Sequence, residues 1–306
     1  MLILPFVPPQ PVSTTARHGF DYVTADAARR RVYAGHGGNS SLLIVDADTG
    51  KVLGQVHLGG GPGGVAGVAV DAADGHVFTG DGDNNAISEV DPVAMKEVHR
   101  VAVAGHVDAI AYDPKLHRIY GDEDDGTRIF VIDSRTFKQI GTVALPGHKP
   151  EYLAIDPKTH VVYQNIATNS EIAVVDPKTL KVVRTIPTPE IANNHPLQID
   201  IDDGTLLVGG KGKLSLYTLR GKHLATVSMP ARVDQCTFDD ARHMLACAAN
   251  SSLVLYKVAG KRAPVEVGIR KVARGMHTVG VDFKTGRFWV VWGTPSGDFV
   301  QGFVYR

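Results

Sequence analysis

The sequence predicts an all-β protein, a seven-bladed β-propeller, from three observations. A short apolar segment that ends in Asp recurs seven times along the 306 residues. Successive copies lie 37 to 46 residues apart, which is the length of one four-stranded propeller blade. A polar turn and then a segment rich in β-branched and aromatic residues follow each copy, as expected for a second strand.

The predicted first strands show a period of two. Side chains one and three positions before the Asp are mostly large, and those two and four positions before it are often small, which suits sheets stacked face to face around an axis. The seven strands end at Asp26, Asp71, Asp113, Asp156, Asp202, Asp239 and Asp282.

The remaining strands of each blade follow in order. Second strands are expected at 31–34, 76–79, 118–121, 161–164, 206–208, 244–246 and 288–291. Third strands follow, for example at 42–45, 129–132 and 172–175. Turns such as 46–51 and 176–181 contain the Gly, Asp and Pro that turns favour, and each leads into a fourth strand.

The last repeat stops after its third strand, at 299–306. The N-terminal segment Leu2 to Val7 is predicted to supply the missing strand. Pairing the two ends of the chain in one blade closes the ring and removes the exposed edges of an open sheet. Residues 1–306 are therefore predicted to form a single domain.

The segment 153–186, LAIDPKTHVVYQNIATNSEIAVVDPKTLKVVRTI, resembles the YVTN-type seven-bladed β-propeller proteins. The tetrapeptide that gives the family its name belongs on the second strand, where this chain has Val162-Tyr163-Gln164-Asn165. The chain also distantly resembles streptogramin lyase in size and blade number. These resemblances imply the propeller fold, but such proteins include surface proteins, binding scaffolds and enzymes, so function has to come from the site.

Composition excludes several classes of protein. The chain is 43% hydrophobic and 21% charged, which is typical of a folded globular protein. Its 32 basic residues equal its 32 acidic residues, so no nucleic-acid partner is expected. The N-terminal apolar run is too short for a membrane span and no basic residue precedes it. We expect a monomer.

The two cysteines, Cys236 and Cys247, fall on predicted strands of blade six. We expect them to pack in the core without forming a disulfide framework. Because two cysteines do not define a redox compartment, a cytoplasmic location and a periplasmic or secreted one, after removal of a signal peptide, both remain open.

Histidines and carboxylates gather just before the first strands. Five histidines lie five to eight residues before a repeat Asp: His18, His106, His148, His195 and His277. The position five before the Asp is polar in five blades, as Asp21, Asp108, Glu151, Asp234 and His277, with Ala66 and Leu197 as exceptions. In a propeller these segments open on the same face as the loops between second and third strands, so their side chains are predicted to converge at one mouth of the central channel.

Imidazole and carboxylate groups are the usual ligands of divalent transition metals. The predicted metal ligands are His18, His106, His148 and His195, and the metal itself is not identified. Glu151, Tyr152 and His277 are the predicted catalytic residues, and Asp21, Tyr22, Asp108, Asp234 and Lys211 are predicted to bind the ligand. The resulting hypothesis is a small-molecule metalloenzyme, a lyase or hydrolase rather than a redox enzyme, in which the metal polarises a carbonyl or activates water.

Two other interpretations remain. The histidines could be solvated, or could hold neighbouring blades together by hydrogen bonds, in a non-catalytic propeller that binds a peptide, a glycan or another protein.

The run Gly59 to Gly64 lacks the Lys-Ser/Thr of a phosphate-binding loop. It stands where other blades carry His, and it predicts an opening in the ring for a ligand.

Overall fold

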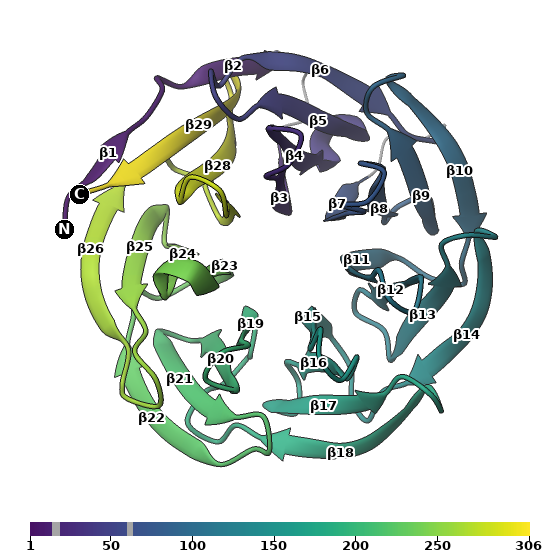
Figure 1. The fold of residues 1–306 in the computed structure, drawn as a ribbon, viewed down its shortest axis with the longest axis vertical. Helices are drawn as coiled ribbons and strands as arrows, with labels where there is room; N and C mark the ends of the chain where they lie inside the picture. Colours follow the sequence, from purple (N-terminus) through teal and green to yellow (C-terminus); the bar gives the residue numbers. More distant parts are fainter. Residues whose placement is uncertain (14–18, 60–63) are drawn as a thin grey trace.

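The computed structural model of the protein describes residues 1–13, 19–59 and 64–306. These residues form seven antiparallel sheets arranged around a central axis (Figure 1). In each sheet the first strand lies nearest the axis and the last strand lies on the outer rim. The structure confirms the predicted seven-bladed propeller, and no helix among the described residues is long and apolar enough to cross a membrane.

Blades one to three run as follows. Blade one contains β3 (Val23–Asp26), β4 (Arg31–His36), the short 3-10 helix η1 (Gly37–Asn39), β5 (Ser41–Asp46) and β6 (Val52–His57). Blade two contains β7 (Val65–Val70), β8 (Val77–Asp81), β9 (Ala86–Asp91) and β10 (Lys96–Ala102). Blade three contains β11 (Val107–Asp113), β12 (Arg118–Glu123), β13 (Arg128–Asp133) and β14 (Lys138–Ala144).

Blades four to six repeat the same order. Blade four contains β15 (Pro150–Ile155), β16 (Val162–Ile166), β17 (Glu171–Asp176) and β18 (Lys181–Pro187). Blade five contains β19 (Leu197–Asp200), β20 (Thr205–Gly210), β21 (Lys213–Thr218) and β22 (His223–Ser228). Blade six contains β23 (Val233–Asp239), the 3-10 helix η2 (Asp240–Arg242), β24 (Met244–Ala249), β25 (Ser252–Lys257) and β26 (Val265–Lys271).

Blade seven joins the two ends of the chain. Its three C-terminal strands are β27 (Thr278–Asp282), β28 (Arg287–Thr294) and β29 (Gly297–Tyr305). The N-terminal strands β1 (Ile3–Pro5) and β2 (Gln10–Ser13) both pair antiparallel with β29, with Ile3 opposite Tyr305. This confirms that the N-terminal segment supplies the missing strand.

The recurring Asp caps the turn that follows each first strand. In blade one, Asp26 Oδ1 accepts hydrogen bonds from the backbone N–H groups of Ala28 and Arg29, at 3.0 and 2.9 Å. Asp side chains favour such turns because the carboxylate satisfies N–H groups that the turn leaves unpaired. The same bonds recur in other blades, for example from Lys115 and Leu116 to Asp113.

In blade five the capping residue is Asp200, so the predicted repeat position Asp202 was wrong by two residues. Asp200 accepts from the N–H of Asp203 at 3.0 Å. It also lies opposite Thr205 in the sheet, as Asp26 lies opposite Arg31. The segment Ile199-Asp200-Ile201-Asp202 offers two Asp residues after apolar ones, and spacing alone did not choose between them.

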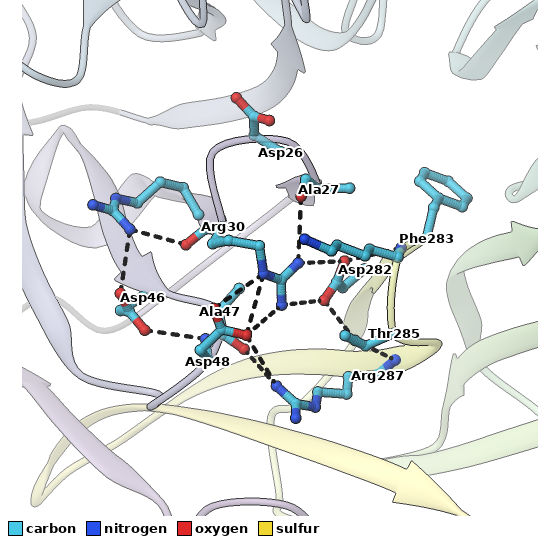
Figure 2. A network of polar contacts seen from close by, with 12 residues as sticks. Asp26, Ala27, Arg30, Asp46, Ala47, Asp48, Asp282, Phe283, Thr285 and Arg287 are labelled. Carbon is cyan, nitrogen blue, oxygen red and sulfur yellow. Dashed lines mark hydrogen bonds and ion pairs between the residues drawn. The ribbon is translucent and has the colours of Figure 1, made fainter.

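Ion pairs reinforce the closure between blades one and seven (Figure 2). Arg30 contacts the buried carboxylate of Asp282 at 2.7 Å and Asp48 at 2.8 Å. From blade seven, Arg287 donates to the carbonyl of Ala47 at 3.0 Å. The Arg30–Asp282 and Arg287–Ala47 contacts join residues more than 230 positions apart in sequence and so fix the last blade against the first.

The two cysteines differ from expectation. They lie directly opposite each other on β23 and β24, with Cα atoms 4.0 Å apart, and they form a disulfide. Both are buried, so their predicted core position is confirmed. The expectation of packing without a disulfide was wrong because the strand register places two side chains of one hairpin face to face, which the separation in sequence did not reveal.

Candidate functional site

Seven equivalent positions surround one mouth of the central channel. Each lies five residues before a turn-capping Asp, and once Asp200 replaces Asp202 the blade-five member becomes His195 instead of Leu197. We call this set the mouth ring: Asp21, Ala66, Asp108, Glu151, His195, Asp234 and His277. Six of its seven members are therefore ionisable, and the single apolar one belongs to blade two.

Four members of the mouth ring form a continuous chain of contacts across blades four to seven. His195 Nε2 lies 2.9 Å from Glu151 Oε2 and 3.0 Å from Asp234 Oδ1. The other oxygen of Asp234 lies 2.5 Å from Nδ1 of His277. Lys149 Nζ approaches Glu151 at 3.6 Å. This part of the ring alternates carboxylate and imidazole, so opposite charges face each other.

The charges of this chain reinforce one another. Burial acts to lower the pKa of His195, but the hydrogen bond to Glu151 and the charges of Asp234, Glu151 and Asp108 outweigh it and raise that pKa to about 9. Burial likewise opposes the raised pKa of His277, which results from its bond to Asp234. Asp234 shows the reverse, because His277 and His195 hold its pKa below the usual value despite burial. Near neutral pH His195 is therefore an imidazolium that faces the carboxylate of Asp234.

The opposite side of the ring carries carboxylates without such partners. Burial, followed by the charges of Asp124 and Glu151, raises the pKa of Asp108 to about 7. Burial and the charges of Asp108 and Asp234 raise the pKa of Asp21 well above its usual value. Gln235 donates to Asp21 at 2.8 Å and the Tyr22 hydroxyl to Asp108 at 3.2 Å. The two carboxyls hold protons at a pH where exposed Asp is ionised.

A second layer of polar residues behind the ring was not predicted as part of the site. Asp122 is completely buried and accepts from the N–H of Ala109 at 2.7 Å and from Gln164 at 2.9 Å. Burial and the charge of Asp108 raise its pKa well above the usual value. The sequence signal was Gln164 on an otherwise apolar second strand.

A cavity of about 530 Å³ opens at the mouth beside blade two. Its acidic and imidazole lining consists of Asp21, Asp83, Asp108, Asp124 and His106. Gly64 and Ala66 lie on its blade-two side, where larger side chains would narrow it. An opening was predicted here from the glycine run, of which residues 60–63 lie outside the described part of the chain.

Below the ring the channel contains a smaller cavity of about 170 Å³. Tyr22 and Tyr152 line it with their rings 5.6 Å apart, together with Gln198 and Gln235. Burial raises the pKa of both tyrosines. The hydroxyl groups are therefore protonated hydrogen-bond donors at the base of the mouth.

The structure brings most of the predicted site residues together. Glu151, His195, Asp234 and His277 share the contact chain, while Asp21, Tyr22, Asp108 and His106 lie on the cavity side. His148 and Lys211 differ, because both are exposed on loops. The backbone N–H and carbonyl of His148 form hydrogen bonds with the hydroxyl of Thr168. His18 lies outside the described residues.

Possible metal ligands with closely spaced donor atoms occur in two groups among residues 1–13, 19–59 and 64–306. They are Asp74, His76 and Glu89 in blade two, and Asp200, Asp203 and His243 between blades five and six. Neither group belongs to the mouth ring. The metal site predicted from His18, His106, His148 and His195 therefore remains a prediction.

Comparison with known proteins identifies the fold and leaves the family open. No family model matches the chain, and no curated protein matches its sequence. Among solved structures, a chain of Kuenenia stuttgartiensis hydrazine synthase is similar, with a TM-score of 0.81 at 14% identity, covering 94% of this chain and 96% of that one. A chain of a mitotic checkpoint complex is also similar, with a TM-score of 0.82 at 13% identity, covering 99% and 92%. At such identities the likeness extends to the propeller fold alone, and the resemblance to YVTN-type proteins gains no support beyond it.

Proposed function

We propose that the protein is a small-molecule enzyme, a lyase or a hydrolase, whose active site is the mouth ring and the adjoining cavity. The observation that carries this proposal is the chain Glu151–His195–Asp234–His277, which four separate blades contribute. Proton transfer needs titratable groups held in a fixed order, and this chain of carboxylates and imidazoles supplies them at the mouth of the channel.

Each member of the chain has a role in this proposal. Asp234 orients the imidazole of His277 by contact with Nδ1, as a carboxylate orients a general acid or base. Glu151 and Asp234 together hold His195 in its charged form. Nδ1 of His195 is buried and has no hydrogen-bond partner among the described residues, so it is the unsatisfied polar atom of the chain. Tyr152 supplies a donor below.

A divalent cation belongs to the proposal as the partner of the carboxylates on the cavity side. Asp21, Asp108 and Asp124 with His106 offer oxygen and imidazole ligands around one cavity. His106 Nδ1 lies 3.9 Å from Asp124 Oδ2. Burial and mutual repulsion of these carboxylates would both be relieved by a cation. When bound, such a cation polarises a carbonyl group or activates water.

The test is turnover of a panel of small molecules that undergo elimination or hydrolysis, with and without added Zn²⁺ or Mn²⁺. The His195→Gln variant keeps the size and polarity of the side chain but cannot become charged, and we expect its kcat/KM to fall by about 100-fold or more. His57→Ala removes an exposed imidazole from the rim strand β6 and serves as the matched control. Unchanged turnover in His195→Gln would contradict the proposal. A protein that turns over neither class and binds no cation would favour the scaffold alternative.

A further inference from the structure

A second carboxylate and imidazole cluster lies away from the mouth, in the turns that follow the first strands of blades five and six. Asp200 ends β19, Asp203 lies in the following turn, and His243 follows η2. One donor atom from each residue lies within 4.8 Å of the other two. Asp200 is completely buried, and Asp203 and His243 are partly buried.

The propeller repeat shows what this position does elsewhere. In two blades the residue four positions after a turn-capping Asp contacts the capping Asp of the preceding blade. His160 of blade four donates to Asp113 of blade three at 2.8 Å, and Arg30 of blade one pairs with Asp282 of blade seven at 2.7 Å. His243 of blade six and Asp200 of blade five occupy the equivalent positions, whereas blades two, five and seven have Gly75, Gly204 and Gly286 there. The pair of His160 and Asp113 is therefore the direct comparison for His243 and Asp200.

At Asp200 and His243 this contact is replaced by a gap between donor atoms. Asp200 Oδ2 and His243 Nδ1 are both buried, and neither has a hydrogen-bond partner among the described residues. A buried carboxylate oxygen and a buried imidazole nitrogen without partners are each costly, so their occurrence side by side points to a ligand between them. Asp203 adds a second carboxylate, whereas the equivalent position beside the pair of His160 and Asp113, three residues after Asp113, is Leu116.

We propose that Asp200, Asp203 and His243 bind a divalent cation of the zinc type. Two carboxylates and one imidazole form a common zinc ligand set, with metal–ligand distances of about 2.0 to 2.2 Å. In a tetrahedral zinc site with such distances, two donor atoms are about 3.3 to 3.6 Å apart. Donor atoms that lie up to 4.8 Å apart would therefore have to approach one another by up to about 1.5 Å when the metal binds.

A cavity of about 520 Å³ lies beside the cluster. Asp203 and His243 line this cavity together with three cationic side chains, Lys257, Lys261 and Arg262. These positive charges weaken the binding of a cation alone and favour the binding of a cation together with an anion. The site would therefore bind zinc together with a carboxylate or phosphate group, and would join blades five and six through the metal.

The test is an anomalous difference map from crystals soaked in Zn²⁺, because it locates the metal independently of the mouth ring. We expect a peak between Asp200, Asp203 and His243 in the wild type and in the mouth variant Asp108→Asn. The Asp203→Asn variant, which alters a partly exposed ligand while retaining its shape, should lose the peak. A wild-type map without this peak, or a peak that persists at full height in Asp203→Asn, would overturn the proposal.

Thermal unfolding gives a second readout in solution. Saturating Zn²⁺ should raise the Tm of the wild type by about 5 °C, since a ligand that binds only the folded state stabilises it. The Asp203→Asn and His243→Gln variants, each made in the Asp108→Asn background so that the mouth site does not contribute, should lose the shift that the cluster supplies. His160→Gln is the matched control, because it removes the equivalent imidazole from a pair that already has its hydrogen bond, and it should keep the shift. Equal shifts in Asp203→Asn and the wild type would contradict zinc binding at this cluster.

Discussion

The charged state of His195 leads to a prediction that can be worked out from its contacts. Nε2 lies about equally far from Glu151 and Asp234, at 2.9 and 3.0 Å, and the pKa rises from 6.5 to about 9. Burial opposes this rise, so the two carboxylates together supply more than the net change. Glu151 supplies both the hydrogen bond and a charge, so replacing Asp234 by Asn should lower the pKa of His195 by a part of the increase that is smaller than the share of Glu151.

The assay is an NMR titration of the histidine ring protons between pH 5 and 10. The wild type should show one imidazole with a midpoint near pH 9 that is absent from His195→Gln. His277 should also titrate at lower pH in Asp234→Asn, because its pKa is raised mainly by that carboxylate. A wild-type His195 that titrates near pH 6.5, or a midpoint that Asp234→Asn leaves unchanged, would refute this account of the ring.

The same pKa has a consequence for stability. A group whose pKa is higher in the folded state stabilises the fold fully below its unfolded pKa, and this contribution is lost as pH rises through the folded value. For His195 the window runs from pH 6.5 to about 9. At about 1.4 kcal/mol for each pH unit, the contribution lost is about 3 kcal/mol. Urea unfolding of the wild type and of His195→Gln should show a difference in unfolding free energy that shrinks across this window; a difference independent of pH would contradict it.

Three further predictions concern the fold. Arg30→Ala leaves the buried carboxylate of Asp282 without its cation and should lower the unfolding free energy, measured in urea, by about 2 to 4 kcal/mol. The control Arg184→Ala, at an exposed arginine, should lower it by less than about 1 kcal/mol. Equal effects would show that the pair does not hold blades one and seven together. Cys236→Ser should lower the unfolding free energy by about 2 to 3 kcal/mol, because a disulfide that closes a loop of 11 residues restricts the unfolded chain. The wild type treated with reductant should show the same loss. A variant as stable as the oxidised protein would count against this disulfide. Deleting residues 1–7 removes β1 and exposes the edge of β29, so size-exclusion chromatography should show aggregation. A monodisperse product of native stability would show that ring closure does not need β1.

The fold could be predicted from the sequence because one signal was repeated seven times. The Asp that ends each first strand recurs for a local reason, since its carboxylate accepts the N–H groups of the following turn. The missing strand of blade seven could also be predicted, because an open ring would leave an exposed edge. The disulfide could not be predicted, since it depends on the register of β23 against β24.

The candidate site was predicted in part. The position five before each Asp selected Asp21, Asp108, Glu151, Asp234 and His277, which belong to the mouth ring. Taking Asp202 for the repeat placed Leu197 at the fifth blade, although Asp200 places His195 there. His148 and Lys211 differ from the prediction because both are exposed on loops. Asp122 and Gln164 were missed because the repeat spacing does not show which side chains of neighbouring blades turn toward each other.

The central claim is that the mouth ring binds a cation beside its proton-transfer chain, and equilibrium dialysis tests it directly. Untagged wild-type protein and the Asp108→Asn variant would be dialysed against the same free Zn²⁺ concentration and their metal content measured by elemental analysis. Asp108 lines the cavity, and Asn keeps its shape while removing its charge. We predict that the variant holds one equivalent of zinc fewer than the wild type, whatever the blade-five cluster binds. Equal zinc content in the two proteins would contradict the claim.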